Sequence, residues 1–173
     1  MRNKYYVILY TEEGNTMTIP VKAVRNEFDR AEQFCGGCPA AFGGTEKRNR
    51  ETTLVTEVDE ESRHTLKVLR DSRFENFFNA DRRNWNYSFY STTEWQETGQ
   101  EWADPTDRDE GEMDRIVTVA IEAFRGIEER DAIICKLLEL TGSSKAPVED
   151  IRVFRESITV DAFLAFIAKK LGR

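Results

Sequence analysis

Histidine and cysteine are scarce in this sequence of 173 residues, which holds one histidine and three cysteines. A single histidine, His64, argues against catalytic triads and against metal centres that need several histidines. An odd number of cysteines gives no disulfide framework, because disulfides consume cysteines in pairs. This scarcity predicts a reducing compartment, and therefore a cytoplasmic protein.

Long hydrophobic runs are also missing. The best stretch, residues 160–168, is interrupted by Asp161 and is far shorter than the ~20 apolar residues of a membrane-spanning helix. The first ten residues pass into a turn after only a few apolar side chains, which argues against a secretory signal. Charged residues make up 33% of the chain, so we expect a well-solvated surface and no membrane association.

Recognisable catalytic motifs are absent as well, with no nucleophile-elbow, Walker or dinucleotide-binding pattern. The tetrapeptide 35–38, Cys-Gly-Gly-Cys, follows a predicted helix, whereas a redox dithiol should precede one. A zinc site would need four ligands, and only Cys135 and His64 remain elsewhere. The acidic run 104–110 lacks the central glycine of a calcium loop. The sequence therefore predicts a protein that is not an enzyme, with no cofactor and no metal, and it leaves any role of Cys35 and Cys38 open.

The N-terminal half contains a clear hairpin pattern. Residues 5–10 are aromatic and β-branched, residues 12–15 are typical of a turn, and residues 16–21 alternate as a returning strand. Helical spacing of apolar residues then predicts a helix over 21–34, ended by glycines. A second helix is predicted over 59–79, with a buried stripe that begins at Leu66 and ends at Phe78.

The negative charge is concentrated in the middle of the chain. Residues 83–110 hold seven acidic and two basic side chains and all three tryptophans, while the flanking segments are nearly neutral. An acidic segment repels nucleic acid and attracts basic surfaces. A solvated linker and tryptophans that pack on a neighbouring domain are the simplest interpretation, and a partner-binding surface is the alternative.

From residue 111 the pattern is helical to the end of the chain, with apolar faces over 116–124, 133–140 and 148–154. A last helix is expected to begin at Thr159 as its N-cap. We therefore predict an α+β fold in three parts. These are an N-terminal β-hairpin domain with packed helices (1–82), an acidic, Trp-rich linker (83–110), and a C-terminal all-helical, helix-turn-helix-like bundle (111–173).

The C-terminal part resembles the sigma factors of bacterial RNA polymerase, and in particular small sigma-like proteins of Gram-positive mobile elements. The resemblance covers about 90 residues. It rests on short stretches: Asp81-Arg82-Arg83, Tyr87-Ser88, Ala103-Asp104-Pro105, 129–134, 148–151, 157–160 and Lys169-Lys170-Leu171. It implies a non-catalytic helix-turn-helix regulator whose partners are RNA polymerase, DNA or both.

Basic and polar residues of this region are the candidate contacts to nucleic acid. They are Lys145, Arg152, Arg155, Thr159, Lys169, Lys170 and Arg173. The expected recognition helix departs from the family pattern, because it begins with Asp161 and Ala162 and continues with Phe163, where base-reading helices carry polar side chains. This departure weakens the prediction of direct DNA reading.

The alternative is an inhibitor from a phage or mobile element, of the anti-CRISPR type. Its acidic, nucleic-acid-mimicking segment would occupy the channel of a host nuclease or RNA-guided effector. The candidate partner-binding residues are Glu94, Trp95, Glu97, Glu101, Trp102, Asp104 and Asp107. The tryptophans would supply affinity, and the carboxylates would steer association.

Overall fold

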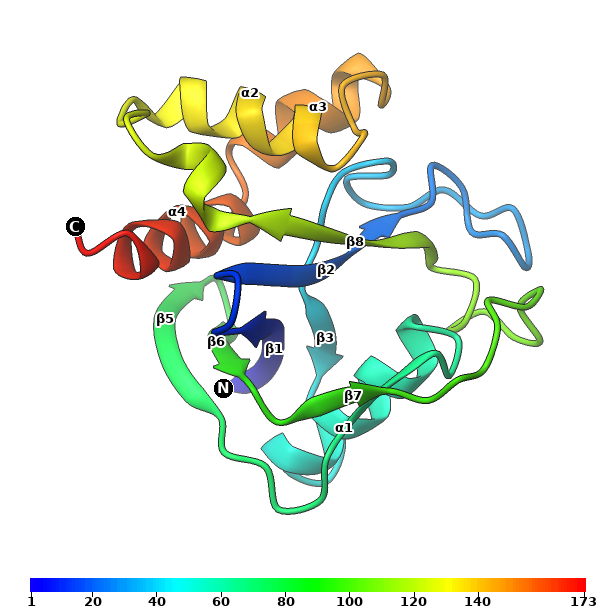
Figure 1. Ribbon diagram of the computed structural model, residues 1–173. Coiled ribbons are helices and arrows are strands. Elements are labelled where there is room, and N and C mark those ends of the chain that lie inside the picture. Colours follow the sequence, from blue (N-terminus) through cyan, green and yellow to red (C-terminus); the bar gives the residue numbers. More distant parts are fainter.

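The computed structural model describes residues 1–173 as a mixed β-sheet with helices on both of its faces (Figure 1). The strands are β1 (Arg2–Thr11), β2 (Thr16–Lys22), β3 (Phe42–Thr45), β4 (Leu66–Val68), β5 (Glu75–Arg82), β6 (Trp85–Thr92), β7 (Trp95–Glu97) and β8 (Met113–Ala120). The helices are α1 (Arg50–Glu61), the short 3-10 helix η1 (Ile121–Phe124), α2 (Arg130–Leu140), α3 (Val148–Arg155) and α4 (Ile158–Lys170).

Strand β1 organises the main sheet, whose order is β5-β6-β1-β2-β8. It pairs in parallel with β6 along eight residues, from Arg2 opposite Trp85 to Leu9 opposite Thr92. On its other edge, β3 pairs with residues 4–7 and β2 pairs with residues 9–11. Strands β4 and β7 form a separate two-stranded sheet. The main sheet joins strands from all three segments that the sequence analysis separates.

The alternation of side chains along β1 divides the hydrophobic core in two, because successive residues of a strand point to opposite faces. Ile8 and Tyr10 pack with the cluster under α2 and α4, whereas Val7 and Leu9 pack with Leu54 of α1. All of these side chains are buried. The sheet is therefore covered by α1 on one face and by the C-terminal helices on the other, as Figure 1 shows.

The hairpin of residues 5–10 and 16–21 is confirmed, but the helix predicted over 21–34 is wrong. Residues 23–41 form a long loop, in which Phe28 and Phe34 are exposed. The side chain of Asn26 accepts hydrogen bonds from the backbone of Phe28 (2.9 Å) and Asp29 (3.3 Å). Asparagine side chains stabilise turns in this way, and the turn replaces the helix.

The helix predicted over 59–79 is also wrong. Helix α1 begins at Arg50 and ends at Glu61. Its N-cap is Asn49, whose side chain accepts a hydrogen bond from the Thr52 amide (2.8 Å). The apolar residues assigned to a helical stripe lie instead in β4, in β5 and in the turn between them. Strand β5 forms because it pairs with β6, a partner that local spacing does not reveal.

The predicted C-terminal bundle, and with it the predicted fold class, is wrong. Residues 113–120 form β8, an edge strand of the main sheet that pairs with β2 from Lys22 to Thr16. Residues 83–110 hold β6 and β7. Helices α2, α3 and α4 do occur near the predicted positions, but they cover the sheet and do not form a bundle of their own.

Helix α4 is fixed to the sheet by its aromatic residues. Phe163 and Phe166 are almost completely buried, and the Phe166 ring lies 4.9 Å from Phe77 of β5 and 5.6 Å from Tyr10 of β1. The N-cap is Ser157, whose hydroxyl accepts a hydrogen bond from the Val160 amide (3.2 Å), and not Thr159 as predicted. The apolar residues in the first turns of α4, which do not suit the reading of bases, therefore belong to the hydrophobic core.

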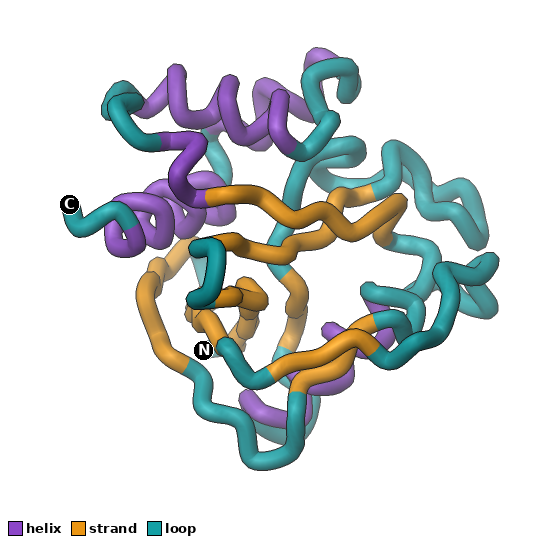
Figure 2. Tube along the Cα trace, in the orientation of Figure 1, coloured by secondary structure: helices purple, strands orange, loops and turns teal.

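Two long loops, 23–41 and 98–112, lie side by side at one end of the molecule (Figure 2). The Glu27 amide donates to the Gly111 carbonyl (2.8 Å), and the Asn26 side chain donates to the Arg108 carbonyl (2.9 Å). None of the helices has the length and apolar character needed to cross a membrane.

Candidate functional site

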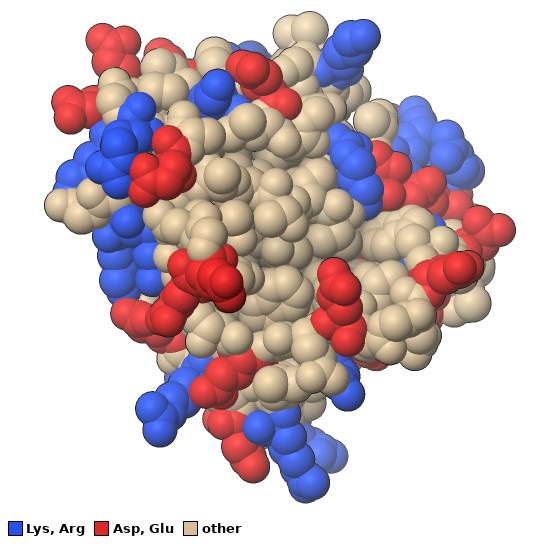
Figure 3. All heavy atoms as spheres, viewed as in Figure 1, with Lys and Arg blue, Asp and Glu red and all other residues tan.

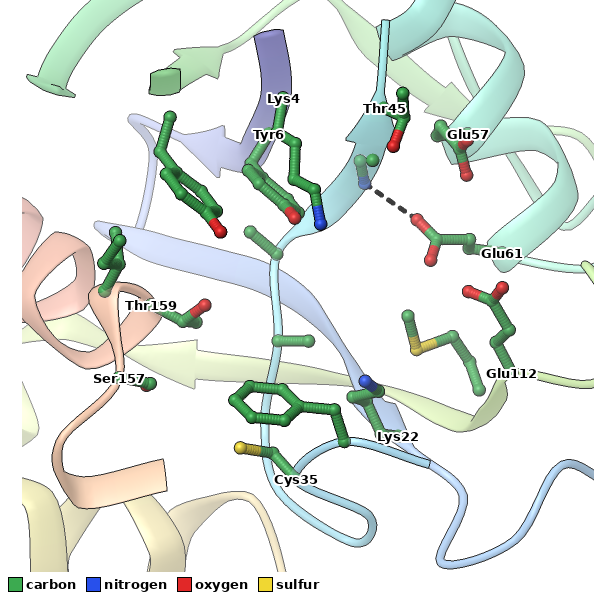
Figure 4. Close-up of a pocket in the computed structure, with 18 of the residues that line it drawn as sticks. Lys4, Tyr6, Lys22, Cys35, Thr45, Glu57, Glu61, Glu112, Ser157 and Thr159 are labelled. Atoms are coloured by element: carbon green, nitrogen blue, oxygen red, sulfur yellow. Dashed lines mark hydrogen bonds between the residues drawn. The ribbon is translucent and has the colours of Figure 1, made fainter. Parts of the chain in front are cut away.

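A cavity of about 480 Å³ opens where the two loops meet the sheet. Its walls come from β1, β2, β3, the end of α1, the start of α4 and the residues just before β8. Figure 4 shows charged side chains of both signs pointing into it. Carboxylates occupy one wall and lysines occupy the other, so the cavity has two chemically distinct sides.

Glu57, Glu61 and Glu112 form the carboxylate wall, and Asp109 of the 98–112 loop also lines the cavity. Glu57 and Glu61 stand four residues apart on α1, a spacing that places both on one face of a helix. Glu112 comes from the end of the 98–112 loop, and its carboxyl group faces that of Glu61 (Figure 4). The side chain of Glu61 is fully buried and accepts a hydrogen bond from the Gly43 amide (2.8 Å).

Glycine is required at position 43 for this contact. Its φ is +152°, and a Cβ there would lie 2.0 Å from the Tyr5 carbonyl oxygen. Only a residue without a side chain can adopt this conformation so close to a neighbouring backbone. Gly43 thus allows β3 to pair with β1 while its amide points toward Glu61.

The three carboxyl groups hold more negative charge than their surroundings neutralise. Burial raises the pKa of Glu57 to about 7, despite the ion pair with Lys47. Burial, followed by the charges of Glu57 and Glu112, raises the pKa of Glu61 well above its usual value. Burial also raises the pKa of Glu112. A buried carboxylate favours its neutral form unless a cation lies beside it, so this wall favours protons or cations.

Lys47 supplies the cation nearest to the wall. Its Nζ lies 3.0 Å from Glu57 Oε1 and 3.4 Å from Glu60 Oε2. The Lys47 side chain is 41% exposed, so the ammonium group reaches Glu57 from the solvent side.

The opposite wall carries Lys4 of β1 and Lys22 of β2, neither of which forms an ion pair within the chain. Burial, then the charges of Lys22 and Arg2, lowers the pKa of Lys4. The ends of the Lys4 and Tyr6 side chains point the same way into the cavity (Figure 4). Two ammonium groups without carboxylate partners favour an anion between them.

The Cys-Gly-Gly-Cys motif borders the same cavity. Cys35 lines it, and Cys38 is completely buried beside it. Both thiols are free, and burial raises the pKa of Cys35 to about 11 and of Cys38 to about 12. Thiols with such pKa values are poor nucleophiles at neutral pH, because the thiolate is the reactive form.

The residues predicted to contact nucleic acid are dispersed over α3, α4 and the adjoining turns. On α3, Arg152 hydrogen-bonds Glu149 (Nε to Oε2, 3.1 Å). Arg155 pairs with Asp131 of α2 (3.7 Å). Both are therefore engaged by neighbouring carboxylates.

The other basic residues of this set lie around the end of α4, apart from Lys145, which is exposed in the turn before α3. Lys169 pairs with Glu75 of β5, and the Lys170 ammonium lies 4.2 Å from the centre of the Tyr10 ring. Arg173 donates to the Ile127 carbonyl (2.8 Å). Thr159, in contrast, lines the cavity. A binding role for these residues stays a prediction.

The predicted partner-binding residues are partly used inside the fold. Trp95 of β7 donates its indole N–H to the Tyr10 carbonyl (3.0 Å), and Trp102 stacks on the Arg63 guanidinium at 4.4 Å. Glu94 accepts from the Arg73 amide (2.8 Å), and Asp107 accepts from the Glu110 amide (2.9 Å).

The remaining three residues of this set, Glu97, Glu101 and Asp104, are exposed. In Figure 3, acidic and basic side chains are interspersed over most of the face shown. A partner-binding role for the whole set stays a prediction.

Sequence reasoning missed Glu57, Glu61, Glu112, Lys4 and Lys22 as a site. The available signal was the helical spacing of Glu57, Glu60 and Glu61, shortly after the glycines at 43 and 44. Glu112 and the two lysines had no local signal, because only the sheet and the loop packing bring them to α1.

No protein-family model matches the sequence, and no curated protein matches it either. The solved structures that share part of this arrangement include several Nudix hydrolases. A MutT Nudix hydrolase from Burkholderia pseudomallei is 10% identical, with 83% of this chain and 98% of that chain covered and a TM-score of 0.48. A MutT structure from a study of Aliivibrio salmonicida and Vibrio cholerae is 16% identical, with 82% of this chain and 97% of that chain covered and a TM-score of 0.48. A Nudix hydrolase from Nitrosomonas europaea is 11% identical, with 88% of this chain and 87% of that chain covered and a TM-score of 0.47.

The fold corrects the sigma-factor interpretation, because residues 113–120 form a strand of the main sheet and α4 lies in the core. The solved structures that share part of this arrangement are named as Nudix hydrolases and not as sigma factors. Of the stretches that carried the resemblance, Asp81-Arg82-Arg83 lies at the end of β5 and Tyr87-Ser88 lies inside β6. The stretch 157–160 begins α4, which is buried against the sheet. Three predictions are wrong: that the protein is a non-catalytic helix-turn-helix regulator, that RNA polymerase or DNA is its partner, and that it is an anti-CRISPR-type inhibitor of a host nuclease or RNA-guided effector.

Proposed function

We propose that this protein is a hydrolase that cleaves a phosphoester or phosphoanhydride bond in a small anionic substrate, with the help of a divalent cation. The observation that carries the proposal is the two-sided cavity, with a wall of three carboxyl groups opposite two lysines that lack carboxylate partners. Phosphoryl groups are anions that bind to lysines directly and to carboxylates through a cation.

The donor chemistry of the carboxylate wall fits a hard divalent cation. Mg²⁺ and related ions prefer carboxylate oxygens, and the raised pKa values of Glu57, Glu61 and Glu112 mark a deficit of positive charge. As the side chains stand, no three histidine, cysteine, aspartate or glutamate residues are arranged to hold a metal ion. Glu57 is engaged by Lys47, and Glu61 and Glu112 engage each other, so these three would hold the cation only after displacing their present partners.

The chain's own groups divide the chemical work. Lys4 and Lys22 bind and orient the substrate phosphate, and their positive charges stabilise its negative charge in the cavity. A carboxylate of the opposite wall accepts a proton from the attacking water. The cation, when bound, polarises the phosphoryl oxygen and neutralises charge. The size of the cavity suits a small molecule and not a polymer.

The test is hydrolysis of a panel of phosphate compounds by the full chain. Pyrophosphate, nucleoside di- and triphosphates and sugar phosphates are incubated with Mg²⁺ or Mn²⁺, and phosphate release is measured. We expect release from at least one compound, loss of release with EDTA, and a loss of at least 100-fold in Glu61→Gln and Glu112→Gln. The matched control is Glu139→Gln, an exposed carboxylate on α2. Absence of hydrolysis across the panel, or equal activity in the two site variants, contradicts the proposal.

We also propose that the protein is cytoplasmic. Its three cysteines are all free, which is typical of a reducing compartment. Fractionation of cells that produce the tagged chain tests this location.

A further inference from the structure

Arg63 and His64 follow α1 directly and adopt an unusual backbone conformation. Their φ angles are +50° and +65°, in the left-handed region that favours glycine. Arg63 is also 95% buried, since only 5% of its surface is exposed. Arginine is rarely buried unless its donors are satisfied. The contacts of these two side chains therefore require an explanation.

The Arg63 guanidinium binds the 98–112 loop and its continuation into β8 at three backbone carbonyls. Nε donates to Glu110 (2.9 Å), Nη1 donates to Ala103 (2.9 Å) and Nη2 donates to Met113 (2.9 Å). The carbonyls of 110 and 113 flank Glu112 on either side. Arg63 thus holds the backbone on both sides of Glu112, the loop carboxylate that faces Glu61.

Two further contacts hold the guanidinium itself in place. It pairs with Glu27 of the 23–41 loop (Nη2 to Oε1, 2.6 Å), and it stacks on the Trp102 ring at 4.4 Å. Its charge is therefore compensated, and its plane is fixed. A glycine at position 63 would suit the backbone but would make none of these contacts.

His64 adds a second link between helix and loop. Nδ1 lies 3.0 Å from Asp59 Oδ1 on α1, and Nε2 lies 3.1 Å from Glu110 Oε2 on the loop. The same Glu110 carboxylate accepts from the Thr106 amide (3.1 Å) and hydroxyl (2.9 Å). Both ring nitrogens thus face carboxylates, one from each element that packs against the ring.

We infer that Arg63 and His64 are positioning residues that lock the 98–112 loop onto the end of α1 and so hold Glu112 opposite Glu61. The inference rests on the proposed function for the importance of Glu112, but the lock itself is a structural claim. Like charges repel, so Glu61 and Glu112 do not hold each other in place when both are ionised. An external link is needed, and it begins at Arg63, two residues after the last residue of α1, Glu61.

The lock has a pH-dependent half. Hydrogen bonds that the ring donates to Asp59 and then to Glu110 raise the pKa of His64 above its usual value. A raised histidine pKa means that the protonated ring binds its partners more strongly in the folded protein. That contribution is fully present below pH ~6.5 and is lost as the pH rises through the raised pKa. The Arg63 half is unaffected, because arginine stays protonated.

Hydrogen exchange of the full chain, followed by mass spectrometry, tests the lock without substrate or cation. Arg63→Gly should speed exchange of the amides in 103–113 at least tenfold and leave β1 and β6 unchanged. Arg63→Lys, which keeps the charge but not the three-way grip, should give an intermediate effect. Glu101→Ala, a change to an exposed side chain of the same loop that makes no ion pair, is the matched control and should have no effect. Unchanged exchange in 103–113, or an equal increase throughout the sheet, overturns the inference.

Two further readouts separate positioning from general stability. In wild type, exchange of 103–110, corrected for the intrinsic effect of pH, should rise between pH 6 and 9, and His64→Gln should abolish this dependence. Mn²⁺ affinity should fall at least threefold in Arg63→Gly and recover partly in Arg63→Lys. A pH dependence that persists in His64→Gln, or loop exchange that rises without loss of Mn²⁺ affinity, overturns the inference. Because exchange needs no turnover, failure of the lock and failure of the proposed hydrolase are distinguishable.

Discussion

The ammonium group of Lys47 lies 3.0 Å from the carboxylate of Glu57. The chain thus provides its own cation to one carboxylate of the candidate site. Lys47 stands on the short segment between β3 and α1, and its partial exposure leaves the ammonium free to swing into solvent. An incoming divalent cation and Lys47 therefore compete for the same oxygen.

Replacing Lys47 by methionine should strengthen cation binding. Removal of a partly exposed ammonium contributes at most about 1 kcal/mol, which corresponds to an affinity gain of roughly twofold to fivefold. Calorimetric titration with Mn²⁺ at pH 8 measures this change. Lys67→Met, at an exposed position of β4, is the control and should leave affinity unchanged. Weaker binding in Lys47→Met would mean that Lys47 organises the site and does not compete.

Replacing Glu61 by glutamine should stabilise the protein at alkaline pH in the presence of EDTA. The raised pKa of Glu61 means that its ionisation opposes folding, and the penalty grows as the pH rises from about 4.5 toward the folded-state pKa. Glutamine is neutral, and its amide oxygen still accepts from the Gly43 amide. We expect a higher Tm at pH 8 and little change at pH 5, with about 2–4 °C for each 1 kcal/mol. A Tm gain of equal size at both pH values would contradict this account.

The lysine wall should bind pyrophosphate. Lys4→Met and Lys22→Met should each weaken pyrophosphate binding by about tenfold at low salt, or about 1.4 kcal/mol, because each removes one partly desolvated ammonium group from the cavity. Isothermal titration measures the affinity. Lys145→Met removes the same charge from an exposed turn, and it should have little effect. A loss of equal size in Lys145→Met would show that net charge, and not the cavity, attracts the anion.

Phe166 should be a major source of stability, because α4 is part of the core. Phe166→Ala should lower the free energy of unfolding by about 3–5 kcal/mol, the range for large buried aromatics. Urea denaturation followed by circular dichroism measures the change. Val148, which is 84% exposed at the start of α3, offers a control whose change to alanine should alter stability by less than about 0.5 kcal/mol. A loss of stability well below this range for Phe166→Ala would contradict the placement of α4 in the core.

Local patterns in the sequence determined the elements that form without distant partners. The first hairpin was predictable, because alternation and a short turn lie within one stretch of chain. Helices α2, α3 and α4 followed from apolar spacing of the helical kind. Strand β8 was missed because Ile116, Val119 and Ala120 also fit helical spacing. Its pairing with β2, about 100 residues earlier, decides in favour of a strand.

The candidate site shows the same division. The sequence sets the helical spacing of Glu57 and Glu61. It also places a glycine at position 43, whose amide donates to Glu61. The partners of those carboxylates were decided by tertiary structure. Glu112 lies on a loop that Arg63 holds in place. Lys4 lies on β1 and Lys22 on β2, and the sheet brings both side chains to the same cavity. Local spacing encodes only which residues share a face of one element. The approach of charges that lie far apart in the chain depends on backbone pairing and core packing, which no short window of sequence contains.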